Sequence, residues 1–130
     1  MAVNTLTTTL VERMDEFTTA YVDEALATTT DNTTPSGGYP LERNYEADDI
    51  AAETLWEMMK DCRTFQEAAG DVILEDLERA GRDFWLTRNG HGAGFWDGDW
   101  PEEDEDRLTD LAKGYGESHL DAYQGIIYGM

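Results

Sequence analysis

Apolar residues recur at the spacing of one helix face near the start of the chain. They fall at Leu6, Leu10, Met14, Phe17, Tyr21 and Ala25, and acidic residues occupy many of the positions between them. A repeat of about 3.6 residues places such side chains on one face of a helix. The sequence therefore predicts a single amphipathic helix over 6–27 with a solvated acidic side.

A second helical pattern follows a stretch without periodicity. Residues 28–45 are rich in Thr, Asn, Gly and Pro and predict a long loop inside the domain. Asp48 or Asp49 then provides a helix cap. The core face beyond it reads Ala51, Leu55, Met58, Cys62, Phe65 and Ala69. A possible capping box after Arg63 leaves open a break in this helix.

The next segment changes from helical to β-favouring residues. A short helix is expected over 71–79, with Gly81 as its C-terminal stop. Residues 83–87 and 94–96 then suggest two strands joined through Asn89-Gly90, a strong hairpin signal.

The end of the chain predicts one more helix and a second hairpin. The acidic run 102–106 is favourable at a helix start and precedes apolar residues at helical spacing. Strands are expected at 119–123 and 126–128. The predicted fold class is α+β: three N-terminal helices, a β-hairpin, one further helix and a short C-terminal hairpin, forming a small antiparallel sheet.

Composition favours one folded domain over residues 1–130. Hydrophobic residues make up 40% of the chain, enough for a core. No apolar run is long enough to span a membrane and the N-terminus does not resemble a signal peptide, so a cytoplasmic location in the host cell is expected. Cys62, the only cysteine, is interpreted as a buried structural thiol.

The strongly negative net charge limits the classes of molecule that the protein is expected to bind directly. The chain has 29 Asp and Glu against 9 Lys and Arg, a net charge of −20. Direct binding to nucleic acid or to an anionic membrane is therefore disfavoured, and a basic partner is favoured. Adaptation to high salt is an alternative explanation for such acidity.

The run from Asp83 to Asp97, DFWLTRNGHGAGFWD, resembles the signature of a family of small proteins carried by bacteriophages, prophages and plasmids. The similarity extends to Tyr21-x-x-Glu24-Ala25-Leu26, to Asn44-Tyr45 and to the closing Ile127-Tyr128. The resemblance implies an origin in a mobile element. It implies no activity and supplies no catalytic residues, so no enzymatic function is expected.

The predicted hairpin contains one candidate ligand site, formed by Arg88, Asn89 and His91 with glycines around them. Such a site would bind an anionic nucleotide signal through a locally positive potential. His91 could also act there as an acid or base, with Arg88 as an anion clamp. Over catalysis we favour the structural alternative, in which Arg88 pairs with Asp97 and His91 hydrogen-bonds the backbone. Neither zinc-ligand spacing nor an EF-hand is present, so no metal or cofactor is expected.

The carboxylates form the preferred candidate site, a surface for the basic groove of a host nucleic-acid-binding protein. A charge of −20 corresponds to roughly 34 Å of DNA duplex at one charge per about 1.7 Å. The leading hypothesis is a nucleic-acid mimic that inhibits a restriction or CRISPR enzyme; the alternatives are a salt-adapted viral accessory protein and the nucleotide binder above. The candidate contact residues are Glu12, Asp15, Glu16, Asp97, Asp99, Trp100, Glu102, Glu103, Asp104, Glu105 and Asp106, with Trp100 as the best exposed aromatic.

Overall fold

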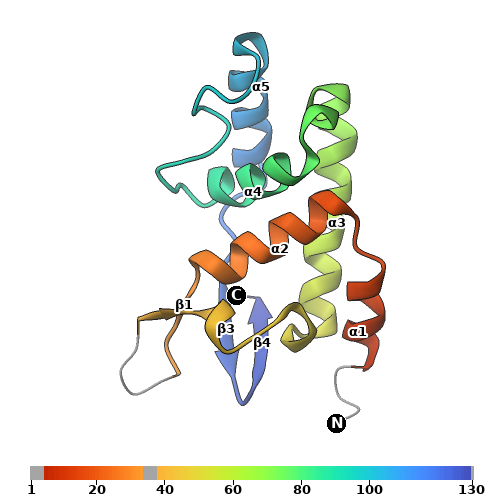
Figure 1. Cartoon of the computed structure of the whole chain (residues 1–130), viewed down its shortest axis with the longest axis vertical. Coiled ribbons are helices and arrows are strands. Elements are labelled where there is room, and N and C mark those ends of the chain that lie inside the picture. The colour runs from red at the N-terminus through yellow and green to blue at the C-terminus, as the bar shows by residue number, and fades with distance from the viewer. Residues whose placement is uncertain (1–4, 34–37, 130) are drawn as a thin grey trace.

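The computed structural model describes residues 5–33 and 38–129 and has the predicted α+β class (Figure 1). Its α-helices in these ranges are α1 (Thr5–Glu12), α2 (Glu16–Thr28), α3 (Ala52–Ala69), α4 (Leu77–Arg88) and α5 (Glu102–Lys113). The short 3-10 helices are η2 (Leu41–Arg43), η3 (Ala47–Asp49) and η4 (Gly70–Glu75). Antiparallel pairs join β1 (Thr30–Asp31) to β2 (Tyr39–Pro40), and β3 (Leu120–Tyr123) to β4 (Ile126–Gly129).

The predicted first helix is two helices, because Asp15 begins a new one. Its side chain accepts a hydrogen bond from the backbone N–H of Thr18 at 2.8 Å, and its backbone is extended. An aspartate at this position satisfies an N–H that has no partner within the helix. The apolar period continues across the break, which is why the sequence pattern did not reveal it.

Helix α3 confirms the predicted core face and runs without a break past Arg63. It begins at Ala52 and not at Asp48 or Asp49, since Asp49 instead accepts a hydrogen bond from the Glu46 N–H at 2.8 Å within η3. Cys62 is fully buried, as predicted, and burial raises its pKa well above the ordinary value.

The predicted hairpin over 83–96 is wrong: residues 77–88 form α4. Asp76 caps this helix by accepting a hydrogen bond from the Arg79 N–H at 3.0 Å. Gly81 is not a stop but a point where α4 lies directly against the α2 backbone, and a Cβ there would collide with the Phe17 carbonyl. Gly90, at φ +69°, follows the helix end, so Asn89-Gly90 terminates α4 instead of joining two strands.

The C-terminal hairpin is confirmed. Asp121 pairs with Tyr128 and Ala122 with Ile127, and the turn has positive φ at Gln124 and Gly125, as tight hairpins require. Because the other predicted hairpin does not form, β3 and β4 remain a separate two-stranded sheet. The Ala51 N–H donates to the Ile127 carbonyl at 2.8 Å and attaches this sheet to the start of α3.

Aromatic rings fill the centre of the molecule. Figure 1 shows α2 crossing the long α3, with α4 beside α2. The rings of Phe65 on α3 and Phe84 on α4 stack with centroids 4.2 Å apart, and Tyr21 on α2 lies 5.1 Å from Phe84. Phe95, from the segment after α4, stacks on Phe65 at 5.6 Å. Residues 83–97 therefore supply rings to the core, where aromatic pairs add to the stabilisation gained by burial.

The loop over 28–45 is largely irregular, as predicted. β1 and β2 close it with two residue pairs, Thr30 with Pro40 and Asp31 with Tyr39. Residues 34–37, at its predicted turn, lie outside the described residues. Nowhere in the described ranges is there a helix that is long and apolar enough to cross a membrane.

Candidate functional site

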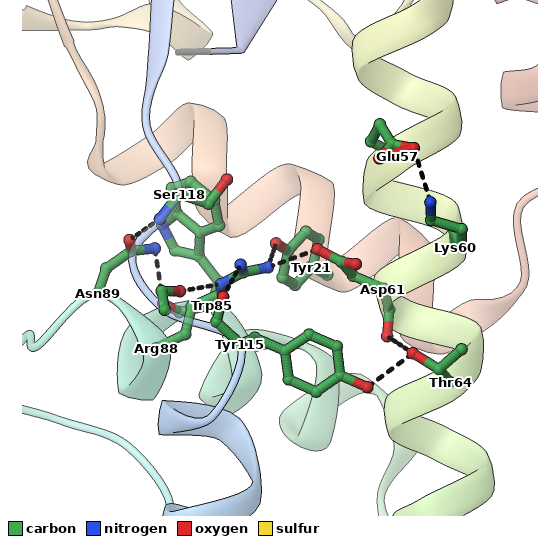
Figure 2. Close-up of polar contacts among 11 residues, drawn as sticks. Tyr21, Glu57, Lys60, Asp61, Thr64, Trp85, Arg88, Asn89, Tyr115 and Ser118 are labelled. Atoms are coloured by element: carbon green, nitrogen blue, oxygen red, sulfur yellow. Dashed lines mark hydrogen bonds and ion pairs between the residues drawn. The ribbon is translucent and has the colours of Figure 1, made fainter.

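Arg88 lies at the end of α4 and is directed into the protein (Figure 2). Its side chain is only 5% exposed, and one Nη donates to Asp61 at 2.9 Å and to the Tyr21 hydroxyl at 3.0 Å. The other Nη donates to the Tyr115 carbonyl at 3.1 Å, and Nε donates to the Gly116 carbonyl at 2.8 Å. This guanidinium joins α2, α3 and the segment after α5.

The surroundings of Arg88 and Tyr21 shift the pKa of both groups upward. Burial of Arg88 acts against its charge, but Tyr21 and Asp61 outweigh that effect and raise its pKa. Burial raises the pKa of the Tyr21 hydroxyl, which therefore stays neutral. A paired and hydrogen-bonded charge of this kind holds segments in register, and loss of one partner is costly. The cluster is structural, and the predicted Arg88–Asp97 pair is wrong.

Asn89 connects the hydrogen-bond network around Arg88 to Ser118, in the segment before β3. Its Oδ1 accepts a hydrogen bond from the Ser118 N–H at 2.7 Å, while its Nδ2 donates to the Trp85 carbonyl at 3.0 Å (Figure 2). The Trp85 indole N–H donates to the Thr28 hydroxyl at 2.8 Å. Asn89 therefore positions the segment before β3 against α4.

A polar hollow of about 550 Å³ lies beside these contacts. Its lining includes Asn89, His91, Ser118 and His119, so it brings together the two histidines of the chain. His119 is exposed and its Nε2 lies 3.1 Å from a Glu117 oxygen, whereas the His91 backbone N–H donates to the Leu86 carbonyl at 3.0 Å. This contact fixes the backbone of His91 at the end of α4, and the predicted hydrogen bond from its side chain stays a prediction.

The described residues contain no group of three or more His, Cys, Asp or Glu side chains that could hold a metal ion. The hollow between His91 and His119 is lined by two imidazoles and by hydroxyl groups, among them those of Thr28 and Ser118.

Trp100 is buried, contrary to its prediction as the best exposed aromatic. Its side chain fills the core at 5% exposure, and its indole N–H donates to Asp83 at 2.7 Å. Burial raises the pKa of Asp83, although the hydrogen bond from Trp100 opposes that shift. Trp96 is the exposed ring of this segment, with the Lys113 ammonium 5.8 Å from its centroid.

Asp97 and Asp99 have partners within the protein. Asp97 accepts a hydrogen bond from the Gly94 N–H at 3.0 Å and holds the turn closed. Asp99 pairs with Arg79 at 3.0 Å, where both side chains are partly exposed. These two carboxylates are available to a partner protein only in competition with their present contacts.

The α5 carboxylates divide into two groups. Asp104 pairs with Arg107 at 3.2 Å, and Glu105 is half-buried. Four others are exposed, and no ion pair within the described part of the chain involves them: Glu102, Glu103, Asp106 and Asp110. Three of these, Glu102, Asp106 and Asp110, are spaced by four residues and form the α5 row. Asp110 was not among the predicted contact residues, although its spacing from Asp106 would have identified it.

The predicted acidic residues of the first helix do not join this row. Glu12 ends α1, which lies on the opposite side of α3 from α5 in Figure 1, while Asp15 and Glu16 begin α2, which crosses α3. Asp15 also accepts a hydrogen bond from Gln66 at 3.2 Å, so it has a structural role in addition to capping. The predicted contact residues are thus distributed over two separate surfaces.

A further acidic surface surrounds Asp23 on α2. Partial burial, and then the nearby carboxylates of Glu42 and Glu78, raise its pKa. Like charges that raise a carboxyl pKa must lie close together in the fold. The sequence did not reveal this cluster, because its members come from α2, η2 and α4.

No protein-family model, curated protein or solved structure matches this chain.

Proposed function

We propose that this protein binds the basic, nucleic-acid-binding surface of another protein and acts there as a nucleic-acid mimic. The observation that carries the proposal is the α5 row of Glu102, Asp106 and Asp110, which are exposed and have no ion pair among the described residues. The proposal involves binding and no catalysis. It places the protein in the cytoplasm of a host cell.

The cations of α5 do not neutralise the row. Arg107 donates to the Ala69 carbonyl at 3.0 Å and pairs with Asp104, and Lys113 lies over the Trp96 ring. Both are committed to contacts within the fold. The negative field of the row therefore extends outward, where it would accelerate association with a positively charged groove.

The spacing of the row is compatible with that of phosphates. Four helical residues advance about 6 Å along the axis. Every second phosphate of one DNA strand advances roughly 6.8 Å. A groove that binds nucleic acid would therefore meet a line of carboxylates whose axial spacing is similar to that of two phosphate steps.

The partner class follows from the sequence resemblance. A mobile element gains from blocking a host enzyme that recognises its DNA or RNA, so we infer a restriction or CRISPR enzyme as the partner. The overall charge of −20 is sufficient for this competition, being equivalent to roughly 34 Å of duplex.

The experiment compares two variants with the same change in charge. Glu102→Gln/Asp106→Asn/Asp110→Asn removes the α5 row. The control, Asp71→Asn/Glu75→Gln/Asp121→Asn, neutralises three exposed carboxylates elsewhere that have no ion pair in the described ranges. Each protein is immobilised, host lysate is applied at low salt, and captured proteins are identified after elution with sodium chloride.

The proposal expects selective capture of a nucleic-acid-binding enzyme by the wild type and the control variant, with loss of capture by the α5 variant. A DNA or RNA ligand of that enzyme should also displace it. Equal capture by both variants would show that total charge, and not the α5 row, governs binding. Capture of generic basic proteins alone would contradict mimicry.

A further inference from the structure

Two arginines differ from the other cations of this acidic chain. Seven of the nine Lys and Arg residues make ion pairs or lie over aromatic rings: Arg43, Lys60, Arg79, Arg82, Arg88, Arg107 and Lys113. Arg13 and Arg63 are exposed, and neither makes an ion pair with any residue that the structure describes. In a protein with a large excess of carboxylates, unpaired guanidinium groups are unexpected.

Both arginines line the same hollow, which we name the Trp56 pocket. It has a volume of about 200 Å³. Arg13 comes from the connection between α1 and α2, whereas Trp56 and Arg63 come from α3. The complete lining is Arg13, Met14, Asp15, Thr18, Trp56, Met59, Lys60 and Arg63. Figure 1 shows the elements that supply these residues close together beside the middle of α3.

The pocket has an aromatic wall that is open to solvent. Trp56 is 54% exposed, an unusual position for the largest apolar side chain. Met59 and Arg63 follow it at intervals of three and four residues, so all three lie along one face of α3. The distance from Trp56 to Arg63 along the helix is about 10 Å. A ligand that reaches from Trp56 to Arg63 must therefore be longer than a single small ion. A ring joined to a charged group has about this length.

The remaining charges in the pocket are already engaged. Lys60 is directed along α3 to Glu57, at 3.0 Å (Figure 2). Asp15 accepts hydrogen bonds from Thr18 and Gln66, which outweigh the effect of its partial burial and lower its pKa. The free cationic groups are therefore those of Arg13 and Arg63. Guanidinium groups bind phosphate oxygens through paired hydrogen bonds.

We propose that the Trp56 pocket binds a nucleoside monophosphate, with the base stacked on Trp56 and the phosphate held by Arg13 and Arg63. Stacking on an exposed indole suits any nucleobase. The net charge of −20 opposes each added phosphate, so a ligand with one phosphate is favoured over a polyanion. This site is independent of the carboxylate surface on α5.

The test measures binding of adenosine 5′-monophosphate by calorimetry at low salt, with adenosine, inorganic phosphate and a short single-stranded oligonucleotide as comparison ligands. Arg13→Gln/Arg63→Gln removes the phosphate contacts and Trp56→Leu removes the stacking surface. The control, Arg43→Gln/Arg79→Gln, makes the same change in net charge with cations that already have partners. Circular dichroism establishes that each variant is folded.

We expect saturable binding of the monophosphate that is tighter than binding of adenosine or phosphate alone. Each pocket variant should weaken it by about tenfold or more, and the charge control by less than about threefold. Backbone amide shifts in NMR spectra should gather at residues 13–18 and 56–63.

Three binding results and one NMR result would overturn the assignment. The binding results are absence of saturable binding at millimolar ligand, equal weakening by the charge control, and tighter binding of the oligonucleotide. Shifts gathered at the hollow between His91 and His119 would place the ligand elsewhere and would also contradict it.

Discussion

The cluster around Arg88 and the α5 row place charged side chains in opposite environments. Arg88 is 5% exposed and contacts Asp61, Tyr21 and two backbone carbonyls, so its charge is satisfied within the fold. The α5 carboxylates are exposed and lack ion pairs among the described residues. The comparison shows that charge in this protein occupies two separate environments: the Arg88 cluster is satisfied within the fold, and the α5 row remains exposed to solvent.

Removing the buried charge should have the largest effect. Arg88→Gln leaves Asp61 and Tyr21 without their donor, and loss of one partner of a buried pair costs about 3–5 kcal/mol of unfolding free energy. The lower end is expected here, because the Asp61 side chain is 31% exposed. Urea denaturation measures the change. Arg82→Gln, which breaks an exposed pair on the same helix, is the control and should cost about 1 kcal/mol or less.

Overpacking between α2 and α4 should have the next largest effect. Gly81→Ala places a Cβ against the Phe17 carbonyl, and forcing atoms into a packed interior costs about 1–3 kcal/mol. Gly92→Ala is the control, since no atom lies within 4 Å of the added Cβ. Thermal unfolding of both variants tests the prediction, and equal melting temperatures would show that the helices can move apart at no cost.

Loss of the α2 cap should be smaller and should depend on pH. Asp15→Ala removes the acceptor for the Thr18 N–H, at a cost of about 0.5–2 kcal/mol. The pKa of Asp15 is lowered in the fold, so its stabilisation is present above the ordinary pKa of aspartate and declines as the pH falls through the folded value. Stability curves of the variant and the wild type should therefore converge in acid. The control, Glu12→Ala, removes an exposed carboxylate at the end of α1 and should cost about 0.5 kcal/mol or less at neutral pH.

Neutralising the α5 row should change stability least. Exposed substitutions of this kind usually alter the unfolding free energy by no more than about 0.5 kcal/mol each. Glu102→Gln/Asp106→Asn/Asp110→Asn should therefore keep a melting temperature near that of the wild type in moderate salt, while capture of the partner is lost. A large loss of stability would show that these carboxylates stabilise the fold as the Arg88 cluster does. That result would contradict the difference between the two regions.

The sequence alone separates the Arg88 cluster from the α5 row only in part. Periodicity identified α3, α5 and the C-terminal hairpin, because each depends on contacts between residues close in the chain. It also identified most of the exposed α5 carboxylates. It did not reveal the inward direction of Arg88 or the burial of Trp100, because Asp61 and Asp83, which receive their hydrogen bonds, are distant in sequence.

In the segment after Asp76, the local composition favours a strand but tertiary packing produces a helix. Its run of Phe84, Trp85, Leu86 and Thr87 has the composition of a strand, and local preferences differ by only about 1 kcal/mol or less per residue. Burying one large apolar side chain contributes about 1.5–3 kcal/mol. Packing of Phe84 and Trp85 on Tyr21 therefore decides the conformation in favour of a helix.

The sequence by itself determined the α+β class, the amphipathic α3, the buried Cys62, the final hairpin and the excess of negative charge, since these follow from composition and from spacing along the chain. The tertiary structure alone decided which charges are satisfied within the fold and which remain exposed. It paired Arg88 with Asp61 and left Arg13 and Arg63 beside Trp56 without partners among the described residues. Partners of charged groups are selected by distance in space, which the order of residues does not specify.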